Sequence, residues 1–469
     1  SPVIMGKIRT PFFNHSRFDL NRLRQDPQNV HINFQNYLGG FSENVIEIIE
    51  NFQLEKPVEK LNKSNRLFQF IDKLSEVDLH PDKVSNHMMG QIFEELLRRF
   101  SEMSNETSGE HYTPRDVVRL LVSLVFSEDT DNLKGEGIVR SIFDPCCGSG
   151  GMLTIAKEWI HENVSDDIEL RLTGQELNPH TYSVCKSDMM NTGENPDNVR
   201  LGNSLSEDRF SGDRFDYMIT NPDIVDYGSD KEFVRNEGQN PNGRFSAGTP
   251  RTSDGQLLFL QHMISKMEDR GSRIGIVLNG SSLWTGNAGG GESEIRRWII
   301  ENDWLECIVS LPNAMFFNKG IPTFLWILTN KKSERRRGKV QLIDGSSLFV
   351  QMKKKILRKR KEVSPTQRDE ILNLYLNFEE GENCQVHPNK YFGYTTVQVE
   401  QPLIENGSVV TDRRGNPKPD FSKRDHGRVS LSDDIDEYFD KEVKPHLPDS
   451  WLDRSKDKVG YEINFNQYF

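Results

Sequence analysis

One segment of the chain, residues 143–153, combines a short apolar strand, a glycine-rich turn and the start of a helix. Glycine lets a backbone pass close to a ligand where any Cβ would collide with it. The first turn of the helix adds backbone N–H groups that no helical carbonyl uses. This pattern predicts an α/β domain with a ligand-binding turn. The residues expected to contact the ligand are Asp144, Cys146, Gly148, Ser149, Gly150 and Gly151.

Asp144 indicates which ligand the turn accepts, because it places a carboxylate where the strand ends. A phosphate-binding turn avoids a negative charge at that position, whereas a ligand with an ammonium group and a sulfonium is attracted to it. The turn therefore favours S-adenosylmethionine over a nucleotide. For a glycine turn taken alone, the alternative is an ordinary strand-to-helix connection without a ligand.

Two downstream residues extend the expected cofactor site. Glu176 ends a second strand, residues 170–176, and lies 28 residues after Gly148. An acid at the end of the second strand of a nucleoside-binding α/β unit is suited to accept both ribose hydroxyls. Asn203, in a later turn, is suited to hydrogen-bond the adenine ring. Taken singly, Glu176 fits a surface carboxylate and Asn203 a turn residue, but their order after the glycine turn favours a cofactor site.

The size and composition of the chain limit which kind of protein it can be. Its 469 residues are enough for two or three domains. No run approaches the ~20 apolar residues of a membrane span, so we expect a cytoplasmic protein without a membrane anchor. Five cysteines form neither a disulfide framework nor a zinc spacing, which fits a reducing compartment and no metal site. The chain begins without an initiator methionine or a signal peptide, so we expect a fragment or a processed product.

Strands and helices alternate between about residues 138 and 330, which predicts a doubly wound, mostly parallel sheet. Residues 227–252, polar and rich in glycine and asparagine, are expected to form a long loop that is functional or mobile. The expected domains are an N-terminal helical domain at 1–108, a central α/β domain at 109–345 and a C-terminal extension at 346–469. The expected strands are residues 139–143, 170–174, 216–220, 273–278, 305–310 and 323–328.

The strand at 216–220 ends in a candidate catalytic motif, Asn221-Pro222-Asp223-Ile224. The exocyclic amine of adenine is a poor nucleophile because its lone pair is delocalised into the ring. The amide oxygen of Asn221 and the carbonyl of Pro222 are suited to accept its two hydrogens and to favour the developing positive charge. The base must first leave the duplex stack, at a cost of roughly a few kcal/mol. One alternative for this motif is an ordinary Asn-Pro turn. Another is transfer to cytosine N4, which shares the amine chemistry and which these residues alone do not exclude.

Charge is unevenly distributed along the chain. The net charge of −12 argues against a freestanding, uniformly basic DNA-binding protein. Residues 353–361 hold seven basic residues in nine, which we interpret as a basic helix with either a solvated face or a face that follows phosphates. The acidic segment 433–440 carries Ile435, Tyr438 and Phe439, and predicts a helix that docks either on a partner or on its own domain.

With these motifs in order, the chain resembles the modification subunit of type I restriction–modification systems, a family of adenine-N6 DNA methyltransferases. The resemblance covers nearly the whole chain. Besides the glycine turn, its motifs are Tyr112-Thr113-Pro114, Gly174-Gln175-Glu176-Leu177-Asn178, Gly202-Asn203-Ser204, Asn221-Pro222, Asn242-Gly243-Arg244-Phe245, Ser253-Asp254-Gly255, Gly291-Glu292-Ser293-Glu294-Ile295-Arg296-Arg297, Leu311-Pro312, Gly320-Ile321-Pro322-Thr323 and Val459-Gly460-Tyr461-Glu462-Ile463.

The resemblance implies a Rossmann-like S-adenosylmethionine-dependent methyltransferase sheet with an N-terminal helical domain, truncated at its start, and a C-terminal extension. It adds Tyr112, Thr113 and Pro114 to the cofactor-binding residues. The implied activity is methylation of adenine N6 in double-stranded DNA, with the target adenine flipped out. The implied partners are DNA, a specificity subunit that reads it, a second copy of this subunit and a separate restriction subunit. Partner and DNA contacts are expected in the C-terminal extension, and the N-terminal helices are a second expected site of assembly.

The candidate catalytic motif departs from the family pattern of Asn-Pro-Pro followed by Phe or Tyr. Ile224 has no π face to stack on a flipped base, a contact worth ~1–3 kcal/mol. Asp223 brings a carboxylate to the reacting centre, where desolvation is costly. Tyr227 is a candidate replacement for the missing aromatic ring. The alternative function is therefore a catalytically impaired, cofactor-binding scaffold subunit, whereas Asp144 and the missing three-glycine pattern disfavour a dinucleotide-dependent oxidoreductase.

Overall fold

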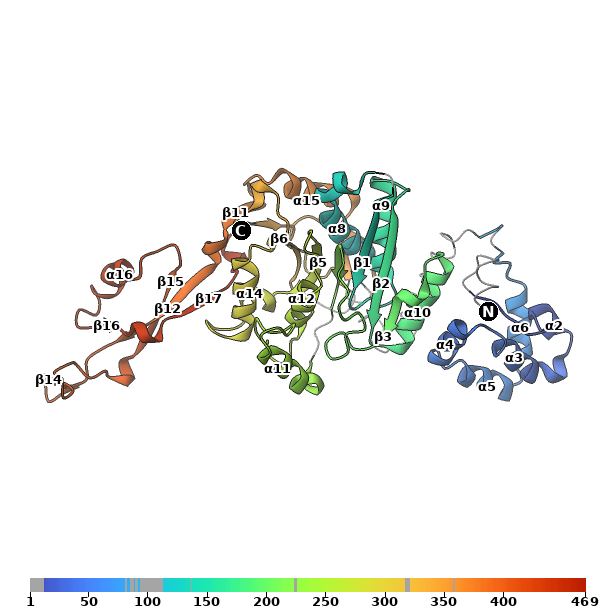
Figure 1. Cartoon of the computed structure of the whole chain (residues 1–469), viewed down its shortest axis with the longest axis horizontal. Coiled ribbons are helices and arrows are strands. Elements are labelled where there is room, and N and C mark those ends of the chain that lie inside the picture. The colour runs from blue at the N-terminus through green and yellow to red at the C-terminus, as the bar shows by residue number, and fades with distance from the viewer. Residues whose placement is uncertain are drawn as a thin grey trace. The chain divides into compact units, whose positions relative to one another are not determined.

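The computed structural model describes residues 12–80, 82–84, 88, 92, 113–135, 137–222, 226–316, 321–356 and 359–469. The chain forms two compact units. The first comprises Ser1–Val118 and Leu133–Ser211, and the second comprises Arg119–Asn132 and Gly212–Phe469. Figure 1 labels their helices and strands. The sequence predicts three domains, and that division stays a prediction.

Short amphipathic helices form the N-terminal part of the first unit (blue in Figure 1). Their apolar residues recur at three- and four-residue spacing and therefore face a shared interior. This core consists of Leu23, Val30, Phe34, Val58, Leu67 and Ile71. The helices are α2 (Leu20–Arg24), α3 (Val30–Leu38), α4 (Glu43–Asn51), α5 (Glu55–Lys63) and α6 (Leu67–Ser75).

The rest of the first unit alternates strands and helices. In chain order these are β1 (Val139–Asp144), α9 (Gly151–Asn163), β2 (Glu169–Glu176), α10 (Pro179–Asn191) and β3 (Val199–Leu201). β2 pairs in parallel with β1 and with β3, so that Asp144 lies opposite Gly174 and Glu176 lies opposite Leu201. Parallel strands bring their carboxyl ends to one edge. Asp144, Glu176 and the turn that follows β3 therefore share this edge.

Within the same unit, the carboxylate of Glu47 in α4 joins the N-terminal helices to α10. It accepts a hydrogen bond from the Tyr182 hydroxyl at 2.8 Å and pairs with the Lys186 ammonium at 2.5 Å. Lys186 is buried. Because a buried ammonium is stable only with a partner, this pair specifies how α4 packs on α10.

The second unit has a sheet with the strand order β11-β8-β6-β7-β5-β4. β4 runs parallel to β5 and β6 runs parallel to β8, whereas β7 is antiparallel to both β5 and β6. Strands β4 to β7 are buried along their whole length, as expected for strands covered on both faces. The strands are β4 (Tyr217–Thr220), β5 (Arg273–Asn279), β6 (Leu305–Ser310), β7 (Thr323–Thr329), β8 (Lys339–Asp344) and β11 (Cys384–Pro388).

The structure confirms the predicted α/β class and all six predicted strands, β1, β2 and β4 to β7. The sheet is not purely parallel, because β7 enters between β5 and β6 in the opposite direction and β11 is antiparallel to β8. The helices of the second unit between these strands are α11 (Lys231–Gln239), α12 (Gln256–Ile264), α13 (Ser281–Trp284), α14 (Gly291–Glu301) and α15 (Pro365–Asn377).

The expectation of one long loop without regular structure at 227–252 is wrong, because part of the segment is helical; its functional or mobile character stays a prediction. The segment contains α11, with Val234 buried. Two hydrogen bonds connect its later part to neighbouring helices. Gln261 Nε2 in α12 donates to the Gly248 carbonyl at 3.0 Å, and the Arg251 N–H donates to Glu292 Oε1 in α14 at 3.0 Å. A short helix with so few apolar residues has too weak a periodicity to stand out in the sequence.

The expectation of a basic helix at 353–361 is also wrong. The region forms an antiparallel hairpin of β9 (Val350–Ile356) and β10 (Lys359–Glu362), with Gln351 opposite Lys361 and a bulge between Lys359 and Lys361. Lysine and arginine are good helix formers, but the sequence offers no apolar stripe that would bury a helix there, and the pairing of β9 with β10 outweighs their helix propensity.

The C-terminal part of the second unit is built on a long strand, β12 (Gly393–Glu400), which pairs antiparallel with β15 (Asp425–Ser430), β16 (Trp451–Leu452) and β17 (Lys458–Tyr461). The acidic segment forms a helix as predicted, α16 (Ile435–Tyr438) followed by one π-helical turn. Phe439 is buried, which favours docking on its own domain over docking on a partner. Among the described residues, no helix is long and apolar enough to cross a membrane.

Candidate functional site

The glycine turn after β1 is held on the neighbouring strand by backbone hydrogen bonds. The Cys147 N–H donates to the Gln175 carbonyl at 3.0 Å, and the Gly150 N–H donates back to the Cys147 carbonyl at 2.8 Å. Gly148 and Gly150 have φ angles of 53° and 88°, in the left-handed region that glycine adopts without strain. The turn then leads directly into α9 at Gly151, as the sequence predicts.

Asp144 lies buried at the end of β1, with 1% of its surface exposed. Its Oδ1 accepts a hydrogen bond from the Cys146 N–H at 2.9 Å. The base of the turn is held from another side, where the Ser204 hydroxyl donates to the Pro145 carbonyl at 2.6 Å. Asp144 therefore shapes the turn, besides offering a negative charge to a ligand.

The Glu176 carboxylate accepts two backbone hydrogen bonds at this edge. Its Oε2 accepts the Gly148 N–H at 2.9 Å, and its Oε1 accepts the Asn178 N–H at 2.8 Å. The carboxylate thus links the glycine turn to the start of α10, where Asn178 is the N-cap. A carboxylate oxygen has two lone pairs, so each of these oxygens is able to accept more than one hydrogen bond.

The turn that carries Asn203 is hydrogen-bonded to the end of β2, where Glu176 lies. The Gly202 N–H donates to the Glu176 carbonyl at 2.9 Å, and Asn203 Oδ1 accepts the Leu205 N–H at 3.0 Å. The structure therefore brings Gly148 and Glu176 into contact and places Asn203 at the same edge. The role of Asn203 toward an adenine ring stays a prediction.

Cys147 and Cys185 meet beneath the turn, with their sulfurs 3.9 Å apart. The hydrogen bond to Cys185, together with burial, holds the pKa of the Cys147 thiol well above its usual range. All five cysteines are free. A high pKa disfavours the nucleophilic thiolate, so this pair fits the predicted role of small buried side chains.

Thr113 and Pro114 directly precede α8 (Arg115–Phe126), and the Pro114 carbonyl accepts the Val118 N–H at 3.0 Å. Pro114 therefore stands at the helix entry, where the sequence predicts it. Tyr112 lies outside the described residues. The part that these three residues play in cofactor binding stays a prediction.

Asn221 and Pro222 follow β4 in the second unit, and Pro222 is buried. The Pro222 carbonyl accepts a hydrogen bond from Gln256 Nε2 at 2.8 Å. The Oε1 of the same side chain accepts the Asn279 N–H, at the end of β5, at 3.1 Å. The other two residues of the candidate catalytic motif, Asp223 and Ile224, lie outside the described residues.

A second layer of polar contacts surrounds Gln256. Asp254 Oδ2 accepts hydrogen bonds from Asn279 Nδ2 at 3.4 Å and from the Ser281 hydroxyl. Arg251 lies 3.5 Å from the same carboxylate. Sequence reasoning missed Gln256 and Asn279; the signal available was the motif Ser253-Asp254-Gly255, which immediately precedes Gln256 and had no role assigned.

Tyr227 does not replace the missing aromatic residue of the motif. Only 3% of its surface is exposed, and its hydroxyl donates to the Pro250 carbonyl. Its N–H donates to the Thr252 carbonyl at 3.0 Å. The residue is buried, and both its hydroxyl and its backbone N–H are hydrogen-bonded to the protein. The ring therefore has no free face for a flipped base, and this expectation is wrong.

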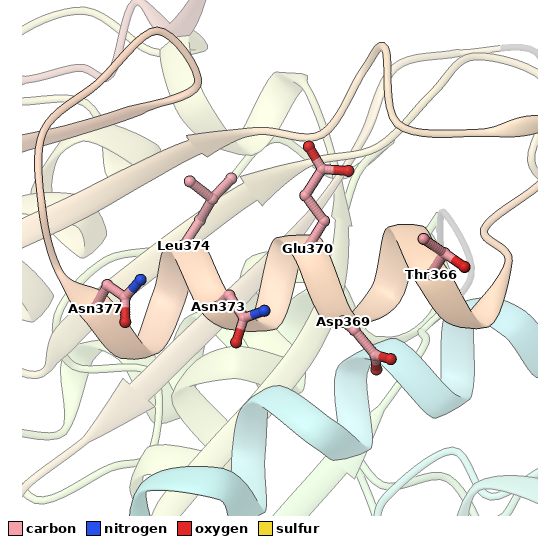
Figure 2. A pocket seen from close by; sticks show the side chains of 6 residues that line it. All are labelled: Thr366, Asp369, Glu370, Asn373, Leu374 and Asn377. Atoms are coloured by element: carbon pink, nitrogen blue, oxygen red, sulfur yellow. The ribbon is translucent and has the colours of Figure 1, made fainter.

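A separate pocket lies along α15, and Figure 2 shows the side chains that line it. All six come from this one helix, and none belongs to the candidate site. Two of them are carboxylates and two are amides, and we assign the pocket no ligand. The lining residues are Thr366, Asp369, Glu370, Asn373, Leu374 and Asn377.

Comparison with known proteins places these features in a family. A family model described as N-6 DNA Methylase matches residues 84–396, more than half of the chain. The type I restriction enzyme MjaIX methylase subunit of Methanocaldococcus jannaschii is 28% identical over 379 residues, covering 80% of this chain and 63% of that protein. The HindI methylase subunit of Haemophilus influenzae is 30% identical over 273 residues, covering 58% and 57%. The chain thus spans about six tenths of the length of these relatives.

Solved structures show the same fold. A type I restriction-modification system methyltransferase subunit from Streptococcus thermophilus has a TM-score of 0.66 at 22% identity, covering 83% of this chain and 80% of that chain. A class I S-adenosylmethionine-dependent methyltransferase, described as putative, from Listeria monocytogenes has a TM-score of 0.51 at 18% identity, covering 76% and 98%. At these identities the likeness is one of fold.

Proposed function

Because the chain belongs to the N-6 DNA Methylase family, we propose that it transfers a methyl group to the N6 atom of adenine in double-stranded DNA. It does so as the modification subunit of a type I restriction–modification complex. The observation that carries the proposal is the junction of β1 and β2, where the Glu176 carboxylate receives the Gly148 N–H of the glycine turn. The family and the fold imply S-adenosylmethionine as the cofactor.

The residues at this junction fit that cofactor in their chemistry. Asp144 and Glu176 are both buried carboxylates, suited to an ammonium group and to ribose hydroxyls respectively. Cys146, Ser149 and Gly151 complete the backbone that passes beside the ligand. When bound, the cofactor supplies an electrophilic methyl group on a sulfonium. Tyr112, Thr113, Pro114 and Asn203 complete the proposed binding set.

The chemistry on the base falls to Asn221 and Pro222. The side-chain amide oxygen and the proline carbonyl accept the two hydrogens of the exocyclic amine, which turns the nitrogen lone pair toward the electrophile. Proline has a fixed φ, which restricts the local backbone, while the direction of its carbonyl still depends on ψ. The scaffold alternative receives no support from the described residues, since Asp223 and Ile224 lie outside them.

The proposal extends to the partners of the complex. A specificity subunit selects the site, a second copy of this subunit shares the complex, and a restriction subunit is separate, all in the cytoplasm. The β9–β10 hairpin supports a DNA contact in the C-terminal extension, because Lys353 and Lys361 lie on one face of it and Arg360 is exposed. Basic side chains that neutralise phosphates make binding salt-dependent.

The test is methyl transfer by the chain assembled with its specificity subunit on DNA that carries the recognised site. We expect transfer to adenine N6 that Asn221→Ala abolishes. Asn163→Ala, at the exposed end of α9, is the matched control and retains activity. Cofactor binding without transfer above the Asn221→Ala level would contradict the proposed enzyme. Transfer to cytosine would contradict the assigned base.

A further inference from the structure

Gln256 bridges the carboxyl ends of two parallel strands of the second unit. Its amide nitrogen donates to the Pro222 carbonyl after β4, and its amide oxygen accepts the Asn279 N–H at the end of β5. Only 2% of the residue is exposed. The side chain stands at the first position of α12, so the helix start anchors its backbone while the amide reaches the strands.

Only one orientation of this amide satisfies both neighbours. A carbonyl needs a donor and an N–H needs an acceptor, so exchanging the amide nitrogen and oxygen would leave two buried repulsive contacts. Each unsatisfied buried polar group is costly. The amide of Gln256 is therefore oriented by its surroundings, and in turn it holds the Pro222 carbonyl.

We propose that Gln256 is a positioning residue for methyl transfer, which sets the direction of the Pro222 carbonyl toward the adenine amine. The inference rests on the proposed function. A carbonyl oxygen has two lone pairs, and the bond to Gln256 uses one of them. The second is left for a hydrogen of the base. The hydrogen bond prevents the peptide group from rotating between several directions, and misplacement of about 1 Å costs about 100-fold in rate.

Asp254 holds in place the two elements that position Gln256, the start of α12 and the end of β5. Its Oδ1 accepts the Gln256 N–H at 3.4 Å, while its Oδ2 binds the side chains of Asn279 and Ser281. One carboxylate therefore holds the start of α12 and the end of β5 together. This explains why the polar residues after Ser253 lie in the interior rather than at the surface.

The test compares three variants of the assembled complex: Gln256→Met, Gln256→Glu and, as a control, Gln261→Glu. Gln261 is a buried glutamine of the same helix whose amide binds the Gly248 carbonyl instead of Pro222. We measure kcat and KM for DNA methylation, cofactor affinity and thermal unfolding between pH 5.5 and 8.5. The charged groups described beside Gln256 are Asp254 and its partner Arg251, which all variants keep.

Gln256→Met removes both hydrogen bonds, and we expect kcat to fall about 10- to 100-fold with KM and cofactor affinity within about threefold of wild type. In Gln256→Glu the protonated carboxyl donates to the Pro222 carbonyl as the amide did, whereas the ionised form repels it. Its kcat should therefore approach wild type at low pH and fall as pH rises. Gln261→Glu destabilises the fold without this pH profile.

Three results would overturn the inference: an unchanged kcat in Gln256→Met, a loss carried by KM alone, or a Gln256→Glu profile that matches Gln261→Glu. The proposed function fails in a different way. If the wild-type complex transfers no methyl group to adenine, the enzyme assignment falls, whereas transfer that is indifferent to Gln256 refutes only the positioning role.

Discussion

The Glu176 carboxylate accepts the backbone N–H of Gly148 at 2.9 Å across 28 residues of chain. This contact joins the end of β2 to the glycine turn after β1, the two features that the sequence marks as a cofactor site. The residue expected to bind a ribose therefore also shapes the turn that passes beside the ligand. Loss of this side chain affects the fold of the site as well as its affinity.

Glu176→Gln tests this double role. Both carboxylate oxygens accept backbone N–H groups, from Gly148 and Asn178, whereas an amide offers one acceptor and one donor. Hydrogen bonds to charged groups contribute about 1.5–3 kcal/mol. We therefore expect cofactor affinity, measured by calorimetry, to fall at least tenfold and the unfolding temperature to drop. Glu169→Gln, at the exposed start of the same strand, is the control, and an equal effect there would contradict the prediction.

Gly150→Ala should disturb the turn through a collision. A Cβ at this position would lie 2.8 Å from the Cys185 sulfur, in addition to the strain of a left-handed backbone. Gly193 has a similar φ of 79° with no atom within 4 Å of an added Cβ, so Gly193→Ala carries the backbone strain alone. That strain costs roughly 1–2 kcal/mol. Denaturant unfolding should show a larger loss for Gly150→Ala; equal losses would exclude the collision.

Asp188 makes stability depend on pH. Burial raises its pKa from 3.8 to about 6, although the Thr154 hydroxyl donates to it at 3.1 Å. The folded state then holds its proton more tightly than the unfolded state, so stability falls as pH rises from about 4 to about 6 and stays lower above. Asp188→Asn should remove this fall and be more stable than wild type at pH 7.5 by about 1–3 kcal/mol, but not at pH 4.

Urea titrations at the two pH values measure this difference. Asp167→Asn, on the exposed loop after α9, serves as the control for loss of one negative charge. A gain in stability at pH 4 equal to that at pH 7.5 would show that the carboxylate of Asp188 is not the cause.

Glu306 supports the core of the second unit. Although burial opposes its ionisation, the Arg273 and Arg336 guanidiniums hold the pKa of Glu306 below its usual value, and the Tyr375 hydroxyl donates to it at 2.6 Å. Glu306→Gln leaves buried cations without their counter-charge, which costs about 3–5 kcal/mol. Denaturant unfolding should show this loss. Glu437→Gln, in an exposed pair with Lys441, should change stability little; similar losses would contradict the assignment.

Tyr227→Phe tests whether the ring of Tyr227 touches substrate. The hydroxyl donates to the buried Pro250 carbonyl, so its removal should cost about 1 kcal/mol of stability. Because the ring is enclosed, we expect kcat and KM of methyl transfer to stay within about twofold of wild type. A selective rise in KM for DNA would instead place the residue at the substrate.

Much of the architecture follows from local patterns. The strands β1, β2 and β4 to β7 are continuous apolar or alternating runs, which any packing must bury, and they occur where the sequence predicts them. The prediction of a helix at 353–361 is wrong for the opposite reason. A run of lysine and arginine has no apolar periodicity, so only its pairing partner decides that it forms a hairpin.

The sequence by itself determined the α/β class, the glycine turn and the residue types that suit a sulfonium cofactor and an adenine amine. Their order along the chain carries that chemistry. Only the tertiary structure decided which groups meet: Glu176 with Gly148, and Gln256 with Pro222. It also decided that the Tyr227 ring is enclosed. Such contacts join residues far apart in the chain, and packing rather than local preference sets their distances.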